Sequence, residues 1–244
     1  LTVIGRELPP PAEWNYHLDL WQHPAAVARV EGLDMWSDAH FEALVPYMRL
    51  LADAGQKVVT TTLNKDPWNN QCFDSYADMI VWTKNADGAW SYDYTVFDRW
   101  VELMTGLGID HTINCYSMLP WNNELHYRDG VTGRFVDVTA DPGTPAFEEL
   151  WVPFLADFTG HLREKGWLGR TNIAMDERSP EEMADALDLL RKTAPELGIA
   201  MADNKNSYLN YPFINSLCVK VRDRVPPQHI AERRAQGFVT TYYV

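Results

Sequence analysis

The stretch TNIAMDERSPEEM, residues 171–183, joins a short apolar run to the start of a helix. The apolar run has the length of a buried strand, and the sequence Ser-Pro-Glu-Glu at 179–182 is typical of a helix N-terminus. Two adjacent carboxylates, Asp176 and Glu177, stand between them. The stretch predicts a strand-loop-helix unit. Taken alone, the two carboxylates fit a solvated loop, so the rest of the sequence has to decide their role.

The alternation of strand and helix continues through most of the chain. Strands are predicted at 15–22, 57–63, 111–117, 171–176, 198–202, 216–220 and 238–244. Helices are predicted between them, at 38–54, 93–106, 145–165, 180–193 and 226–236. Strands that alternate with helices form right-handed βαβ units around a parallel sheet. The sequence therefore predicts an α/β fold, either a (β/α)₈ barrel or a doubly wound sheet.

The connections between these elements favour the barrel. The segments 64–92 and 118–144 are long, and the first holds a predicted hairpin with its turn at Asp87-Gly88. The links from helix to strand are short by comparison. In a (β/α)₈ TIM-type barrel, elaborated loops follow the carboxyl ends of the strands, where active sites lie. We therefore expect a TIM-type barrel with its chemistry at that mouth.

The two ends of the chain differ from its middle. Residues 1–13 hold a short apolar piece and three consecutive prolines, which predicts a linker at the end of an upstream β domain. Residues 14–244 form the predicted barrel domain. Because only seven strands are found and the last one is apolar, the barrel is expected to be incomplete at its C-terminus and to lack its last strand.

Composition excludes several classes of partner. The 244 residues include 34 acidic and 21 basic side chains, a formal charge of −13, which disfavours nucleic acid. No window suits a membrane span or a leader, and three distant cysteines predict buried thiols. A metal site from His17, Asp19 and His23 is a weak alternative, so we expect neither metal nor cofactor. The compartment stays open, with a secreted or periplasmic full-length protein as one possibility.

Aromatic residues cluster with amides and acids in four places. These are NYHLDLWQH at 15–23, KDPWNNQ at 65–71, CYSMLPWNN at 115–123 and TTYYV at 240–244. Sugar rings stack their C–H faces on aromatic side chains, while their hydroxyls need donors and acceptors. Each cluster alone equally fits amphipathic core residues. Their analogous positions along the chain indicate a carbohydrate site.

Seven motifs together resemble the catalytic domain of glycoside hydrolase family 123. They are HLDLWQHP, WSDAHFEALVPYMRLLADAGQK, DPWNNQ, FDRWVELMTGLGID, INCYSMLPW, FLADFTGHLREKGW and IAMDERSPEEM. The resemblance covers about residues 14–244 and implies a retaining β-N-acetylgalactosaminidase on a (β/α)₈ barrel. It implies a terminal β-linked N-acetylgalactosamine of a glycan or glycoconjugate as substrate, and an upstream β-sandwich domain in the full-length protein. Asp176 and Glu177 match the family's adjacent catalytic carboxylates.

Adjacent carboxylates suit a substrate that supplies its own nucleophile. Most retaining glycosidases hold two carboxylates about 5–5.5 Å apart across the scissile bond, and sequence neighbours are poorly placed for this. A 2-acetamido oxygen can instead attack the anomeric carbon and form an oxazoline-type intermediate. Asp176 would then be ionised and orient the acetamido N–H, while Glu177 would start protonated and act as acid and later as base. Tyr243 is the predicted donor to the acetamido oxygen, although a slip of one position would favour Tyr242.

Further residues at strand ends and in the following loops are predicted to bind the sugar. They are Asp19, Trp21, Trp68, Asn69, Asn114, Tyr116, Trp121 and Asp203. For each one alone, packing or loop capping is an equally good explanation. Two other functions stay open. One is a glycosidase for sugars without an acetamido group, with a second carboxylate from Asp19, Asp66 or Asp203, and the other is a non-catalytic carbohydrate-binding fragment.

Overall fold

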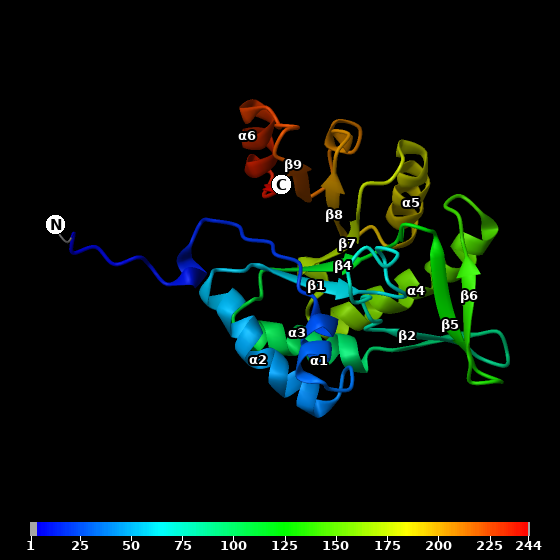
Figure 1. Cartoon of the computed structure of the whole chain (residues 1–244). Coiled ribbons are helices and arrows are strands. Elements are labelled where there is room, and N and C mark those ends of the chain that lie inside the picture. Colours follow the sequence, from blue (N-terminus) through cyan, green and yellow to red (C-terminus); the bar gives the residue numbers. More distant parts are fainter. Residues whose placement is uncertain (1–3, 244) are drawn as a thin grey trace.

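A curled sheet of six parallel strands lies at the centre of the molecule (Figure 1). The computed structural model describes residues 4–243. Along the sheet the strands are β1 (Val58–Thr62), β4 (Thr112–Tyr116), β7 (Thr171–Met175), β8 (Gly198–Asp203), β9 (Ser216–Lys220) and β10 (Val239–Tyr243). Every neighbouring pair is parallel and the spatial order follows the chain. The arrangement is half of a TIM-type barrel, and six of the seven predicted strands are confirmed.

Helices cover the outer face of this sheet. They are α1 (Pro24–Glu31), α2 (Asp38–Asp53), α3 (Thr95–Gly106), α4 (Pro145–Glu164), α5 (Pro180–Thr193) and α6 (Pro227–Ala235), with short 3₁₀ turns η1 (Pro11–Glu13), η2 (Leu168–Arg170) and η3 (Ser207–Leu209). Ser179 caps α5 as predicted, and Ser37 caps α2. Helix α1, which has only eight residues, was not predicted. None of these helices in residues 4–243 is long and apolar enough to cross a bilayer.

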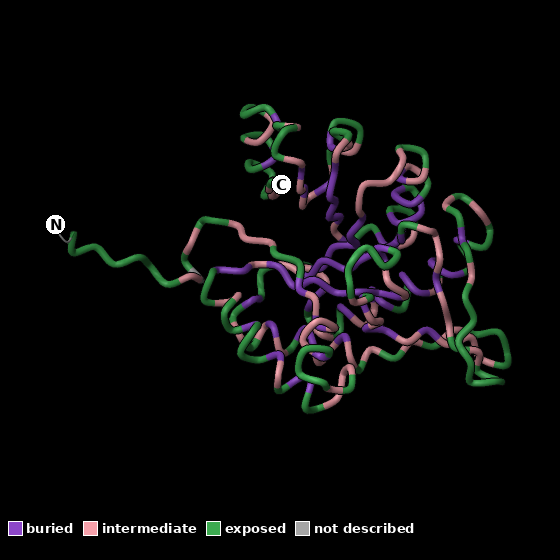
Figure 2. Tube along the Cα trace, viewed as in Figure 1, coloured by how far each residue is buried: buried purple, intermediate pink, exposed green. Residues whose placement is uncertain are grey.

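The apolar side chains between sheet and helices form one large core (Figure 2). Trp100 and Trp151 are fully buried there, and Trp82 stacks on Phe154 with ring centroids 4.2 Å apart. Of the cysteines, Cys115 is buried and Cys218 is half-buried. The prediction of a buried thiol is wrong for Cys72, which is exposed in the loop after β1.

A second, four-stranded sheet grows out of the two long connections. Its strands are β2 (Val81–Lys84), β3 (Trp90–Asp93), β5 (Glu124–Asp129) and β6 (Phe135–Thr139), in the order β3-β2-β5-β6. The predicted hairpin is β2–β3, and Gly88 adopts a positive φ in its turn. The β5–β6 hairpin was not predicted, although apolar residues alternate with polar ones in both strands, at Leu125 and Tyr127 and at Val136 and Val138, because the segment was interpreted as a long loop. Both hairpins follow the carboxyl ends of barrel strands.

The prediction of a strand at 15–22 is wrong. The structure has a single parallel bridge there, between Leu18 and Gln56. The Gln56 side chain accepts from the Leu20 N–H at 2.9 Å, and Gln22 accepts from the Thr60 N–H at 2.8 Å. These side-chain amides occupy backbone groups that a strand ladder would use. The segment therefore runs beside β1 in extended form and covers that edge of the sheet without joining it.

Candidate active site

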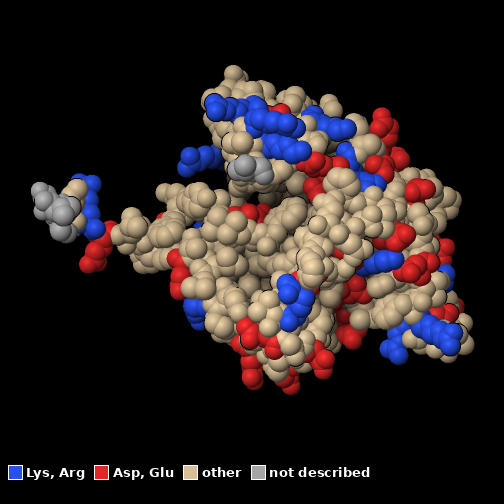
Figure 3. Space-filling view, viewed as in Figure 1, with Lys and Arg blue, Asp and Glu red and all other residues tan. Residues whose placement is uncertain are grey.

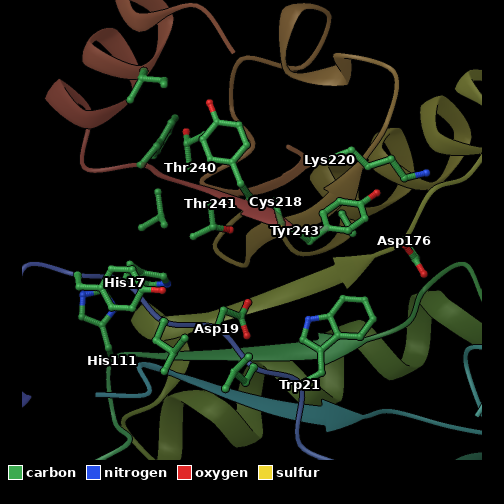
Figure 4. Close-up of a pocket in the computed structure, with 18 of the residues that line it drawn as sticks. His17, Asp19, Trp21, His111, Asp176, Cys218, Lys220, Thr240, Thr241 and Tyr243 are labelled. Carbon is green, nitrogen blue, oxygen red and sulfur yellow. The ribbon is translucent and has the colours of Figure 1, made fainter. Parts of the chain in front are cut away.

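A large cavity opens at the carboxyl ends of the strands, between the 15–21 segment and β10 (Figure 4). Its volume is about 1270 Å³. The 15–21 segment forms one side, Lys220 and residues 238–243 form the other, and Asp176 and Glu177 lie at the β7 end. The cavity occupies the space that separates the two edges of the half-barrel. This is the mouth at which barrel enzymes carry their chemistry.

Strand register explains why Asp176 points into this cavity. Tyr116 pairs with Ala174, and Ala174 pairs with Ala200. These three residues pack together on the inner face, and Asp176 follows Ala174 by two positions, which places it on the same face. Alanines at 174 and 200 leave the interior open above them. The sequence Ile-Ala-Met-Asp-Glu thus delivers a carboxylate to a hollow rather than to the helix-covered face.

Asp176 is held by indole groups. Its Oδ2 accepts from Nε1 of Trp68 at 3.0 Å and from Nε1 of Trp121 at 3.1 Å. Its Oδ1 accepts from the Glu177 N–H at 2.8 Å. Burial raises the pKa of Asp176 above its usual value, and these three hydrogen bonds oppose that rise without cancelling it. The Asp176 carboxylate is fixed in orientation in a partly dry setting.

Glu177 has a different set of partners. Asn204 Nδ2 donates to its Oε2 at 2.7 Å, Lys220 Nζ lies 3.0 Å from its Oε1, and the Tyr243 hydroxyl also donates to Oε1. Burial raises the pKa of Glu177, but hydrogen bonds from Tyr243 and Lys220 together with the Lys220 charge bring it below its usual value. In the free protein the pKa of Asp176 is thus raised and that of Glu177 is lowered. The sequence instead predicted an ionised Asp176 and a Glu177 that starts protonated.

Aromatic rings form the wall beside Asp176. Trp21 lies 5.0 Å from Trp68 and 4.9 Å from Tyr116 between ring centroids. Trp68 and Tyr116 are buried, whereas 38% of Trp21 and 37% of Trp121 is exposed. The two exposed indoles are therefore open to a ligand, and the two buried rings support them. We call Trp21, Trp68, Tyr116 and Trp121 the aromatic wall.

Asp19 lies on the floor of the cavity with an unsatisfied oxygen. Its Oδ1 is buried and has no hydrogen-bond partner among residues 4–243, and burial raises its pKa to about 7. Figure 4 shows its carboxyl directed into the space below β10. His17, two residues earlier, packs edge-on against His111, and burial lowers its pKa to about 4. His23 bonds instead to the Asp74 carbonyl, and within residues 4–243 no three potential metal ligands gather.

Five of the eight predicted sugar-binding residues do not line the cavity: the buried rings of Trp68 and Tyr116, which pack against Trp21, and the polar residues Asn69, Asn114 and Asp203. Asn114 is buried in mid-strand, where its Oδ1 accepts from Asn172 at 2.8 Å. Asp203 is buried and accepts from the N–H groups of Lys205 and Ser207, so it caps the loop after β8. Asn69 accepts from Asn122 at 3.2 Å and joins two loops. In strand β8, Asp203 lies on the same face as Ile199 and Met201, which pack in the helix-covered core. The alternation of the strand therefore already predicted that Asp203 points away from the cavity.

Sequence reasoning also missed residues that do reach the site. Lys220 and Asn204 both contact Glu177, and Cys218 and Thr241 line the cavity. Cys218 pairs with Ala202 and Thr241 in register, and Lys220 pairs with Tyr243. Lys220 follows Cys218 by two positions at the end of β9. Residues two apart in a strand share a face, so Lys220 is expected to point toward the cavity that Cys218 lines.

A family model for the catalytic domain of glycoside hydrolase 123 matches residues 21–244. The chain belongs to this family. A solved structure of a family 123 glycoside hydrolase from Clostridium perfringens, described in connection with glycolipid glycan hydrolysis, is similar with a TM-score of 0.90 and 30% sequence identity. The alignment covers 99% of this chain and 45% of that chain, so the chain spans less than half of its relative's length. No curated protein matches the chain.

Proposed function

We propose that this glycoside hydrolase 123 domain removes terminal β-linked N-acetylgalactosamine by a retaining mechanism in which the 2-acetamido group is the nucleophile. The observation that carries the proposal is the contrast between two adjacent carboxylates. Asp176 is fixed by two indole N–H groups, and Glu177 by an ammonium group and two neutral donors. Two carboxylates on neighbouring residues are poorly placed to flank a sugar ring on its two faces. A mechanism in which the substrate supplies the nucleophile does not need that placement.

In this mechanism the bound substrate counteracts the two pKa shifts of the free protein, upward for Asp176 and downward for Glu177. The acetamido N–H donates to Asp176, which stabilises its ionised form and balances the positive charge that develops on nitrogen. Tyr243 moves its hydroxyl from Glu177 to the acetamido oxygen. Glu177 then loses a hydrogen bond that lowers its pKa, and the ionised form of Asp176 beside it is stabilised. Both changes favour the protonated Glu177 that an acid catalyst needs.

The chemical steps follow from that arrangement. The acetamido oxygen attacks the anomeric carbon while Glu177 gives its proton to the leaving oxygen, and an oxazoline-type intermediate forms. Glu177, now ionised, takes a proton from water, which opens the intermediate with overall retention of configuration. Trp21 and Trp121 offer exposed faces for the sugar ring. Each carboxylate role is worth a factor of about 10²–10⁴ in rate.

The alternative glycosidase mechanism needs a second carboxylate from Asp19, Asp66 or Asp203, and two of these three have other contacts. Asp203 caps a loop away from the cavity, and Asp66 accepts from the N–H groups of Trp68 and Asn70. Only Asp19, of the three candidates, lines the cavity with an unpaired oxygen. A glycosidase for sugars without an acetamido group would therefore use Asp19 together with Asp176 or Glu177.

One comparison of substrates separates the two mechanisms. Purified protein is given an aryl N-acetyl-β-galactosaminide and the matching aryl β-galactoside, and kcat/KM is measured for each. Participation predicts that the first is cleaved faster by a factor of about 10² or more, since the second has no internal nucleophile. Comparable cleavage of both would rule out the proposal. An aryl N-acetyl-β-glucosaminide tests the galacto preference in the same assay.

The binding-only alternative has its own outcome. If the wild-type protein turns over none of these aryl glycosides, yet binds N-acetylgalactosamine and keeps that affinity in the Glu177→Gln variant, the domain is a carbohydrate-binding module. Turnover by the wild type that falls in Glu177→Gln excludes this reading.

A further inference from the structure

A second hollow adjoins the active-site cavity on the Glu177 side. Its volume is about 450 Å³, and it is lined by Lys220, Val221, Arg222 and Tyr243. Lys220 and Tyr243 line both spaces, and both contact Glu177. The hollow therefore borders two side chains that hold the carboxyl group proposed to protonate the leaving oxygen. A saccharide attached to that oxygen would extend into it.

Positive charge gathers in the C-terminal part of a protein that is otherwise acidic. Residues 204–243 contain six Lys and Arg against two Asp and Glu, although the whole chain has a formal charge of −13. Figure 3 shows Lys and Arg side chains collected over α6 and the neighbouring loops, above the hollowed part of this face. We call Lys220, Arg222, Arg224 and Arg234 the cationic rim. Lys220 and Arg234 also line the main cavity.

The arginines of the rim lack the close acidic partners found elsewhere. Arg29, Lys65 and Arg99 each lie 2.7–2.8 Å from a carboxylate oxygen. Arg222 is 3.8 Å from Asp223 and its side chain is 78% exposed. Among the residues that the structure describes, no ion pair within 4.0 Å joins Arg224 or Arg234 to an acid. Exposed cations without partners at one edge of a cavity are available to an anionic ligand.

We propose that the leaving-group side of the site selects glycans in which the saccharide next to the cleaved sugar carries an anion, either a carboxylate or a sulfate. This rests on the proposed function, since it takes Glu177 as the proton donor to the leaving oxygen. Arg222 would hold the anion, because a guanidinium pairs with two oxygens of such a group at once. Arg224 and Arg234 would attract it from a longer range. The strongly acidic remainder of the protein repels anions, which leaves the rim as their route of approach.

The test compares hydrolysis-resistant S-linked disaccharides with one terminal N-acetylgalactosamine and three different second sugars. These are neutral galactose, glucuronic acid and a sulfated galactose. Dissociation constants are measured for the wild type, for Arg222→Gln and for Arg49→Gln. Arg49 is an exposed arginine on α2 without an ion pair among the described residues, so its replacement removes the same charge at a distant place.

The proposal predicts that at least one acidic disaccharide binds more tightly than the neutral one, by about fivefold or more at low ionic strength. Arg222→Gln should abolish that preference and Arg49→Gln should keep it. Raising the ionic strength from about 0.01 to about 0.15 M, which shortens the screening length from about 30 to about 8 Å, should reduce the preference in the wild type. Which anion is preferred identifies the class of glycan.

Equal binding of all three disaccharides by the wild type, or equal loss of preference in both arginine variants, would overturn the inference. The proposed function is judged separately, by turnover of the aryl glycosides. An enzyme that cleaves the aryl N-acetyl-β-galactosaminide but binds neutral and acidic disaccharides alike keeps its function and loses this specificity. A protein that prefers the acidic disaccharide without any turnover keeps the anion site alone.

Discussion

The two sides of the candidate active site shift the pKa values of their carboxyl groups in opposite directions. The aromatic wall surrounds Asp176 with rings and gives it two neutral indole donors, and burial raises its pKa. On the other side Glu177 meets the Lys220 charge, and its pKa is lowered. The difference shows that two residues adjacent in sequence can be given separate electrostatic surroundings when one faces β1 and β4 and the other faces β9 and β10.

The comparison also separates two tasks. The aromatic wall offers apolar faces and N–H groups with a fixed direction, which suits an uncharged sugar ring and its acetamido arm. The β9–β10 side offers charge and hydroxyl groups around the carboxyl that would exchange protons. Variants on the two sides should therefore change the kinetics in different ways. Asp176→Asn and Glu177→Gln are expected to have the largest effects.

Asp176→Asn should lower kcat by a factor of about 10²–10⁴ for every N-acetylgalactosaminide, whatever its leaving group. The amide cannot balance positive charge on the acetamido nitrogen, and that charge develops with all such substrates. The measurement is steady-state kinetics with a phenyl and a dinitrophenyl glycoside. Asp188→Asn, an exposed position on α5, is the matched control. Loss confined to the phenyl substrate would contradict this role.

Glu177→Gln should lower kcat by a similar factor for the phenyl glycoside but far less for formation of the intermediate from the dinitrophenyl glycoside. A good leaving group needs no proton, so the missing acid matters only when the leaving group is poor. A pre-steady-state burst with the activated substrate is the sensitive readout. The exposed Glu181→Gln on α5 should leave both rates unchanged. Equal mild losses in Asp176→Asn and Glu177→Gln would reduce the pair to a loop feature.

Asp19→Asn should stabilise the protein at high pH and not at low pH. The pKa of Asp19 is raised from 3.8 to about 7 in the folded state, so folding favours its proton. The associated stability is present below pH 4 and is lost as pH rises through 7. The variant removes this penalty, which is at most about 4 kcal/mol at pH 8 for a shift of about three units. Urea unfolding at several pH values checks it, and a pH-independent difference would mean that Asp19 titrates normally.

Lys220→Met is expected to have the smallest effect. Removing the ammonium group raises the pKa of Glu177, because a nearby cation no longer stabilises the carboxylate. Glu177 must be protonated to act as acid, so the alkaline limb of the pH profile of kcat/KM should move to higher pH. Lys192→Met, an exposed position on α5, should not move it. A shift to lower pH would mean that Glu177 is not the acid.

The sequence predicted the parts of the molecule that follow from local periodicity. The strands at 171–176 and 216–220 and the capped helix after Ser179 have strong local signals, and their order fixes where Asp176 and Glu177 lie. The β5–β6 hairpin also has a local signal, an alternation of apolar and polar residues on both sides of Asp129-Gly130, but it was not used.

Predictions were wrong where side chains replace backbone pairing between strands. They were also wrong where the alternation of side chains along a strand was not used to decide which face a residue occupies. The 15–22 segment looks like a strand, yet Gln22 and Gln56 bond the backbone across the gap, and no local pattern announces that. Asp203 stands at a strand end like Asp176, but it shares the parity of the helix-covered face. Lys220 was missed because its partner, Glu177, is 43 residues away in the chain.

The most direct test of participation is a crystal structure with the thiazoline analogue of N-acetylgalactosamine, which mimics the cyclic intermediate. The mechanism predicts an Asp176 oxygen within hydrogen-bonding distance of the ring nitrogen. It also predicts Glu177 beside the anomeric carbon on the face from which water attacks, and the Tyr243 hydroxyl turned away from Glu177. A thiazoline ring nitrogen that contacts neither carboxylate, with both groups facing solvent, would contradict it.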